Sequence, residues 1–178
     1  MKTLVIINGQ GGVGKDTFVD LCAINSEEKT YSFSSIAPIK ILAKKLGWND
    51  EKDEKSRKFL SDLKKLSADY NSFPTHYLIY SIERVPEENA LIFVHIREPN
   101  QIKEFLNTIQ EEFFNIRLFT LLLAKTDVSS LAIGNESDEN VYEYEYDFFI
   151  LNDGTLQELE IESRNFLKFI GIPNILKC

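Results

Sequence analysis

A glycine-rich run near the N-terminus constrains the fold of this chain more than any other feature. Residues 9–17 read Gly-Gln-Gly-Gly-Val-Gly-Lys-Asp-Thr and follow an unbroken apolar run at residues 4–7. Apolar residues without polar alternation are typical of a central parallel strand, which is buried on both faces. Glycines let successive backbone N–H groups point at one anion, and the start of a helix adds a partial positive charge at the same place. The run therefore predicts a strand, a phosphate-binding loop and a helix, in that order.

The lysine of this run separates two interpretations of the glycines. The spacing glycine-x-glycine-x-x-glycine also fits a dinucleotide fingerprint, which expects an acidic residue about 20 positions further on to bind a ribose. The second strand pattern instead ends in Ser34 and Ser35, and a dinucleotide gives Lys15 no role. A lysine here suits the last two phosphates of a nucleoside triphosphate. We therefore expect ATP to bind Gly9, Gly11, Gly12, Val13, Gly14, Lys15, Asp16 and Thr17.

The residue after the lysine departs from the simplest phosphate-loop pattern, which has a magnesium-binding Ser or Thr there. Asp16 stands at this place and Thr17 follows it. The hydroxyl of Thr17 can bond a phosphate oxygen or a metal ion. The carboxylate of Asp16 can bind a magnesium-bound water or orient the acceptor, and it equally suits the first turn of a helix because of the helix dipole. Both residues are candidate ligands of Mg²⁺.

Helical and strand patterns alternate along the rest of the chain, which is typical of an α/β fold with a mainly parallel sheet. A length of 178 residues with 43% hydrophobic residues suits one domain with a full core, so we expect a single domain over 1–178. The polar, acidic stretch at 126–146 interrupts the apolar pattern and is expected to leave the sheet. Strands are expected at 4–7, 30–33, 91–96, 116–123 and 148–151, and helices at about 16–24, 36–46, 51–69, 74–82, 99–113 and 155–170.

The charge and composition exclude several classes of partner. A formal net charge of -8 repels nucleic-acid phosphates, so no nucleic-acid partner is expected. The apolar run at the N-terminus is far shorter than the roughly 20 residues that span a bilayer, so no membrane partner is expected. Cys22 and Cys178 show no metal-ligand spacing, and a disulfide between them is not expected in a reducing compartment. These features predict a cytoplasmic protein, and the glycine run adds small-molecule nucleotides as its partners.

Several segments resemble one family of phosphate-transferring enzymes. Glycine-lysine, one residue and then threonine resembles the loop of nucleoside-monophosphate kinases. The form Gly-Lys-Asp-Thr resembles the deoxynucleoside-monophosphate kinases of phages and the related phosphomevalonate kinases of animals. Further segments are similar to the phage-type enzymes in the same order along the chain, at residues 35–40, 53–63, 96–100 and 152–159. Only the glycine run is specific by itself.

The resemblance implies a P-loop NTPase fold: a three-layer α/β/α arrangement with a mainly five-stranded parallel sheet and a lid at about 126–146. It implies ATP and Mg²⁺ as cofactors. It also implies a nucleotide kinase that transfers a phosphoryl group to a small phosphorylated acceptor, a (deoxy)nucleoside monophosphate.

Three cationic residues outside the glycine run are candidates for the site. Arg97 follows the third strand, at the edge where ligands bind in open α/β sheets, and a guanidinium can bind an acceptor phosphate with two bonds. Together with Lys15 and Asp16 it forms the expected catalytic set. Arg57 is the second candidate for binding the acceptor, although a solvated cation on a charged helix is an equal interpretation. Lys125 precedes the lid, where related kinases carry an arginine.

The lid leaves two alternatives open. Residues 126–146 contain no Lys or Arg, whereas kinases of this type normally bring cations over the phosphates. Arg84 and Arg117 are the candidates to supply the missing charge. The chain could instead be a catalytically weak ATP-binding regulatory protein, or a kinase for a non-nucleotide phosphate, similar to phosphomevalonate kinases. Neither histidine has a cysteine or histidine cluster around it, so both are interpreted as structural polar residues.

Overall fold

The computed structural model describes residues 1–126 and 140–175. The chain divides into two compact units, one formed by residues 1–32 with the described residues from 86 onward, and one formed by residues 33–85. The single domain over 1–178 stays a prediction. No helix in the described ranges combines the length and the apolar character that crossing a membrane requires.

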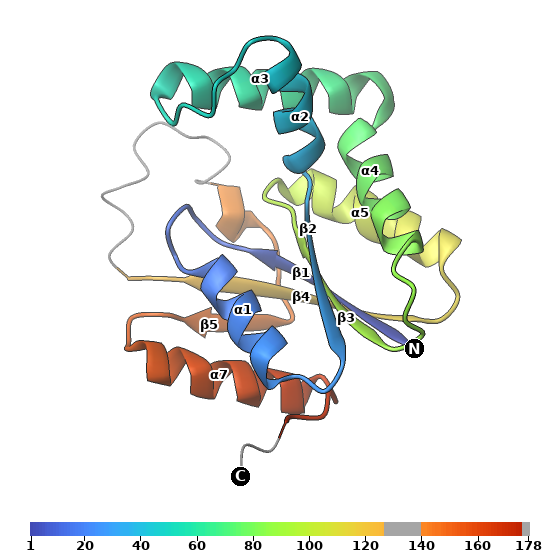
Figure 1. The fold of residues 1–178 in the computed structure, drawn as a ribbon, viewed down its shortest axis with the longest axis vertical. Coiled ribbons are helices and arrows are strands. Elements are labelled where there is room, and N and C mark those ends of the chain that lie inside the picture. The colour runs from blue at the N-terminus through green and yellow to red at the C-terminus, as the bar shows by residue number, and fades with distance from the viewer. Residues whose placement is uncertain (127–139, 176–178) are drawn as a thin grey trace. The chain divides into compact units, whose positions relative to one another are not determined.

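The first unit is organised by a five-stranded sheet with the order β2-β3-β1-β4-β5 (Figure 1). β1 pairs in parallel with β3 and with β4, and β4 pairs in parallel with β5. The expected strands are therefore confirmed. Their bounds are β1 (Lys2–Asn8), β2 (Lys29–Ser34), β3 (Ala90–His95), β4 (Ile116–Ala124) and β5 (Phe148–Leu151).

Three helices cover the two faces of this sheet. α1 (Lys15–Asn25) connects β1 to β2, and α5 (Pro99–Glu112) connects β3 to β4 in the opposite direction along the sheet. Because such crossovers are right-handed, the two helices lie on opposite faces. The last helix, α7 (Leu156–Phe169), lies beside α1 (Figure 1). This arrangement confirms the three-layer α/β/α fold.

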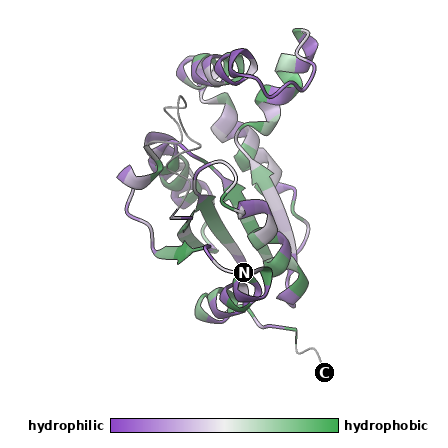
Figure 2. Ribbon diagram, turned by 90° about the vertical axis from the view of Figure 1, so that its left-hand side faces the viewer, coloured by the Kyte–Doolittle hydropathy of each residue, from purple (hydrophilic) through white to green (hydrophobic). Residues whose placement is uncertain are grey.

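A hydrophobic core lies between the sheet and the pair α1 and α7. Alternate residues of the strands point into it, and Figure 2 shows these strands as hydrophobic. Phe166 of α7 lies at its centre, with its ring centroid 5.7 Å from that of Phe18, 6.5 Å from that of Phe93 and 5.2 Å from that of Phe148. Such aromatic pairs add about 0.5–1.5 kcal/mol each beyond the area that they bury. The core thereby fixes α1 against the sheet.

The start of α7 is held by a side-chain cap at Thr155. Thr155 Oγ1 accepts a hydrogen bond from Glu158 N at 3.3 Å, and Glu158 Oε2 accepts one from Thr155 N at 2.7 Å. These hydrogen bonds form a capping box and hold the pKa of Glu158 below its ordinary value. The turn at residues 152–154 is thus fixed between β5 and α7.

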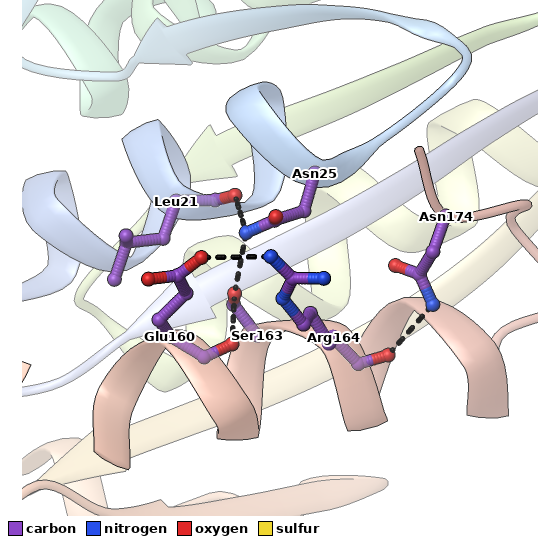
Figure 3. Close-up of polar contacts among 6 residues, drawn as sticks. All are labelled: Leu21, Asn25, Glu160, Ser163, Arg164 and Asn174. Atoms are coloured by element: carbon purple, nitrogen blue, oxygen red, sulfur yellow. Dashed lines mark hydrogen bonds and ion pairs between the residues drawn. The ribbon is translucent and has the colours of Figure 1, made fainter. Parts of the chain in front are cut away.

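A polar network joins the carboxyl end of α1 to α7 (Figure 3). Asn25 Nδ2 donates to Leu21 O at 2.8 Å and lies 3.5 Å from Ser163 Oγ. The main chain after α7 is joined to the same end, because Ile175 N donates to Asn25 O at 2.7 Å. Asn174 Nδ2 in turn donates to Arg164 O at 3.2 Å. Asn25 and Asn174 therefore bond within the protein through their amide nitrogens.

The second unit contains the expected helices α2 (Ala37–Lys45), α3 (Glu54–Asn71) and α4 (Phe73–Glu83). Asp53 caps α3 by accepting a hydrogen bond from Ser56 N at 2.7 Å, which lowers the pKa of its carboxyl. The helical spacing of Phe59, Leu63 and Leu66 predicts that they share the inward face of α3, and for Leu66 this prediction is wrong, since its side chain is 69% exposed. The buried stripe includes Ser56 and Lys64 instead, so the inward face of α3 is more polar than the leucine pattern indicates.

Candidate functional site

The glycine loop, defined here as residues 9–14, lies at the carboxyl end of β1 and leads directly into α1. Gly9, Gly12 and Gly14 have φ angles of 143°, 81° and 95°. A Cβ on Gly9 would lie 2.1 Å from Leu123 O of β4, and a Cβ on Gly14 would lie 2.6 Å from Asn152 Nδ2. Glycine is thus required at both positions by the close approach as well as by the backbone angle.

Lys15 places an ammonium group against this loop. Its Nζ donates to Gly9 O at 2.5 Å and to Gln10 O at 2.7 Å, and the side chain is half-buried. The ammonium therefore lies at the loop and not in the hydrophobic core. Gly14 is the N-cap of α1 and has no side chain that could cap the helix. The first-turn N–H groups and the positive end of the helix dipole thus lie next to the lysine, an arrangement suited to an anion.

Asp16 and Thr17 are exposed in the first turn of α1. Magnesium in nucleotide sites takes one or two protein oxygens and completes its shell with waters and substrate phosphates. A carboxylate and a hydroxyl beside the phosphate-binding loop fit that requirement. Over residues 1–126 and 140–175, no group of three or more His, Cys, Asp or Glu side chains could hold a metal by itself.

Asn152 is a residue of the site that the sequence analysis named only as the start of the segment 152–159. It is buried, its Nδ2 donates to Val13 O at 2.9 Å, and its backbone N donates to Ala124 O at 2.7 Å. It therefore links the glycine loop to the end of β4. The local signal at this position indicates a turn and carries no information about the distant loop.

Asn8 connects the glycine loop to Arg97. Its Oδ1 accepts a hydrogen bond from Gly9 N at 2.7 Å, and its Nδ2 donates to Arg97 O at 2.9 Å. Ile7 is the register partner of His95, so the residues after β3 run alongside the start of the loop. The structure thus brings Arg97 and Lys15 to one edge of the sheet. The sequence analysis did not select Asn8.

His95 lies at the same edge and is linked electrostatically to the loop. Burial lowers its pKa below the ordinary value of 6.5, Asp16 opposes that shift, and Lys15 and Arg97 add to it. Its Nε2 lies 3.1 Å from Ser32 Oγ. The neutral imidazole is therefore favoured next to the cationic groups of the site.

The segment proposed as a lid is described at both of its ends. Lys125 follows β4, and the next residue, Thr126, donates from its backbone N to Asp153 Oδ1 at 2.8 Å and from its hydroxyl to Asp153 Oδ2. These bonds and the charge of Lys125 hold the pKa of Asp153 below its ordinary value. Residues 127–139 lie outside the described residues. At the far end, a 3₁₀ turn, η2 (Asn140–Glu143), precedes the rings of Tyr144 and Tyr146.

Arg117 does not supply charge to the glycine loop, although the sequence analysis named it as a candidate to do so. It donates from Nη1 to Ile170 O at 2.7 Å and from Nη2 to Thr3 Oγ1 at 2.6 Å. Thr3 is its register partner near the amino end of β1, and the strand that separates Thr3 from Asn8 is about 16 Å long. Arg117 therefore bonds at the end of the sheet away from the loop.

The other two arginine candidates belong to the second unit. Arg57 is exposed on α3. Arg84, at the end of α4, has its guanidinium carbon 3.4 Å from the ring centroid of Tyr80, which is a cation–π contact. The role of Arg57 in binding an acceptor stays a prediction.

Comparisons with known proteins agree with this fold. No protein-family model and no curated protein matches the sequence. The chain is similar to the solved structure of a tunicamycin resistance protein from Deinococcus radiodurans, with 14% identity, a TM-score of 0.56 and coverage of 99% of this chain and 100% of that chain. It is also similar to a "putative kinase" from Chloroflexus aurantiacus, with 14% identity, a TM-score of 0.51 and coverage of 95% and 96%. Likeness at this identity concerns the fold, and with the glycine loop and the sheet order the fold is that of a P-loop NTPase.

Proposed function

We propose that this protein transfers the terminal phosphoryl group of ATP to a small phosphorylated acceptor in the cytoplasm, and that the acceptor is a (deoxy)nucleoside monophosphate. The observation that supports this most is the position of Lys15. Its ammonium lies against two carbonyl groups of the glycine loop, beside the uncapped start of α1. One full charge and a set of aligned N–H groups together suit a polyphosphate.

Phosphoryl transfer needs positioning and charge neutralisation more than covalent help from the protein. In our proposal the loop amides and Lys15 bind the last two phosphates of ATP, and Thr17 bonds a phosphate oxygen. Asp16 and Thr17 are the oxygens offered to Mg²⁺, which when bound neutralises charge between these phosphates. The bond from the γ-phosphorus to the bridging oxygen breaks, ADP leaves, and an acceptor oxygen bonds to phosphorus.

Arg97 is our first candidate for binding the phosphate that the acceptor already carries. Its main chain is bonded to Asn8, one residue before the loop, so the arginine belongs to the same edge as Lys15. A planar guanidinium can bind two oxygens of one phosphate, which an ammonium such as that of Lys125 cannot do. Arg57 remains a second candidate, to be tested by substitution.

The proposal is tested by measuring ADP release with ATP and magnesium across nucleoside monophosphates, deoxynucleoside monophosphates and phosphomevalonate. Lys15→Ala should lower acceptor-dependent turnover by about 1,000-fold, because the charge nearest the transferred group is lost. Lys168→Ala is a matched control that removes an exposed lysine from the last turn of α7 and should turn over like the native chain. Native turnover by Lys15→Ala would refute the mechanism.

A second candidate function is a regulatory protein that binds ATP and transfers its phosphoryl group poorly. The lid segment at 126–146 has no Lys or Arg, and Arg117 is bonded to Thr3 and Ile170 at the other end of the sheet. Binding of ATP without acceptor-dependent release of ADP would favour this function. Turnover with phosphomevalonate alone would instead favour the non-nucleotide kinase.

A further inference from the structure

Asn8 combines complete burial with three hydrogen bonds at the start of the glycine loop. Besides the bonds to Gly9 N and Arg97 O, its Nδ2 lies 2.6 Å from the hydroxyl of Tyr146. Both N–H groups of the amide and one lone pair of its oxygen are therefore used. One side chain thus joins the loop, the residue proposed to bind the acceptor, and the chain that precedes β5.

The direction of each bond follows from its partners. A backbone N–H can only donate, so Gly9 fixes Oδ1 as the acceptor, and a carbonyl can only accept, so Arg97 fixes Nδ2 as the donor. The Tyr146 hydroxyl must then accept from Asn8. Its own proton is donated to Val141 O at 2.9 Å. The bonds form one directed series from Asn8 through Tyr146 to Val141.

The hydroxyl of Tyr146 is suited to this place because it stays protonated. Burial raises its pKa to about 12, and the hydrogen bond from Asn8 only partly opposes that shift. The ring of Tyr144 lies edge-on to that of Tyr146, with 5.0 Å between the centroids. The position of the hydroxyl is therefore set by ring packing as well as by its two bonds.

We propose that Tyr146, acting through Asn8, is a positioning residue that fixes the main chain of Arg97 relative to the glycine loop. Without the phenol, one N–H of the buried amide loses its partner and the amide is free to rotate away from Arg97 O. The glycine loop keeps bonds that do not involve Tyr146, namely Asn8 on Gly9 N, Asn152 on Val13 O and Lys15 on Gly9 O. This inference rests on the proposed transfer reaction.

The test is Tyr146→Phe, which removes one oxygen and keeps the ring. We measure ATP affinity by calorimetry, and then kcat and KM with each of the four deoxynucleoside monophosphates. The KM of the acceptor should rise about fivefold, because the Asn8 amide loses one hydrogen bond, while the affinity for ATP changes less than twofold. Equal weakening of both would indicate a structural role and overturn the inference.

Tyr144→Phe is the matched control. It removes a hydroxyl from the other ring of the pair, and that hydroxyl has no hydrogen-bond partner among the residues described. It should leave both constants at native values. If Tyr144→Phe raised the acceptor KM as much as Tyr146→Phe does, the rise would not depend on the bond to Asn8, and the proposal would be overturned.

Asn8→Leu adds a test of the series itself. If Tyr146 acts through Asn8, adding Tyr146→Phe to Asn8→Leu should cause no further rise in acceptor KM, whereas additive effects would overturn the proposal. Should Asn8→Leu fail to fold, the comparison of the two tyrosine variants decides alone. Native turnover by Lys15→Ala would refute the transfer reaction itself, whereas native constants for Tyr146→Phe would refute only this inference.

Discussion

At the carboxyl end of β1 and β3, polar side chains bond to the main chain of the glycine loop, and the ammonium of Lys15 lies beside the uncapped start of α1. At the amino end of β1 and β4, Arg117 bonds to Thr3 and to Ile170 O, close enough to Gly171 that a Cβ there would lie 3.1 Å from Nη1. Lys15 also bonds to carbonyl oxygens, but they belong to the loop proposed to hold a ligand. Lys15 and Arg117 are both hydrogen-bonded, so hydrogen bonding alone does not distinguish the two ends of the sheet.

The two ends differ in the charge of the ion that their main-chain groups attract. The loop carbonyls that Lys15 contacts lie next to N–H groups of a helix start, which attract an anion. Ile170 is the C-cap of α7, and a carbonyl at the carboxyl end of a helix attracts a cation, which Arg117 already provides. The same kind of side chain is thus proposed to bind a ligand at one end and stabilises the fold at the other.

The largest expected effect is the difference between alanine substitutions at two glycines of the loop. Gly9→Ala places a methyl group 2.1 Å from Leu123 O, so the loop or β4 must move. We expect a stability loss of about 3 kcal/mol and a loss of measurable ATP binding. Gly12→Ala meets no heavy atom within 4 Å and should cost only about 1–2 kcal/mol for its φ angle of 81°. Denaturant unfolding and ATP titration measure both; equal effects would contradict the close approach.

Arg117→Ala tests the other end of the sheet. It removes both bonds and should lower the free energy of unfolding by about 2–3 kcal/mol. ATP affinity should stay within about twofold of the native value, because the thermodynamic effects of well-separated sites are nearly independent. Arg97→Ala should instead raise the KM of the acceptor. If Arg117→Ala raised that KM as Arg97→Ala does, the assignment of Arg117 to the fold alone would be wrong.

Local signals in the sequence were sufficient for the elements and for their order. Apolar runs predicted β1, β3 and β4, the last with Arg117 and Thr120 inside it, and Thr155 with Glu158 three residues later caps α7. Such signals reach a few residues along the chain. The bond from Asn152 to Val13 joins residues 139 positions apart, and the bond from Asn8 to Tyr146 joins residues 138 apart. Nothing in the neighbourhood of either asparagine indicates its distant partner.

The error at Arg117 has the same origin. A cation within a predicted strand can point to either face of the sheet and can lie near either end of its strands. Which residues it meets depends on how the strands are paired. Here the pairing of Thr3 with Arg117 fixes its place near the amino end of β1. Lys15 was predictable because its neighbours along the chain form its environment. The candidate site was therefore predictable where it is one continuous segment, and not where strands bring separate segments together.

The smallest expected effect concerns His95 and the dependence of stability on pH. Because burial lowers its pKa below 6.5, the unfolded chain binds more protons than the folded chain when the pH falls through that value. Stability then falls as the pH drops from 6.5 toward the native pKa, and His95→Gln should make that decline shallower. Ser32→Ala removes the hydroxyl 3.1 Å from Nε2 but keeps the imidazole, so it should retain most of the native decline. Unfolding measured from pH 5 to 7 for the three chains checks this, and an unchanged slope in His95→Gln would show that the imidazole is not charged more easily in the unfolded chain.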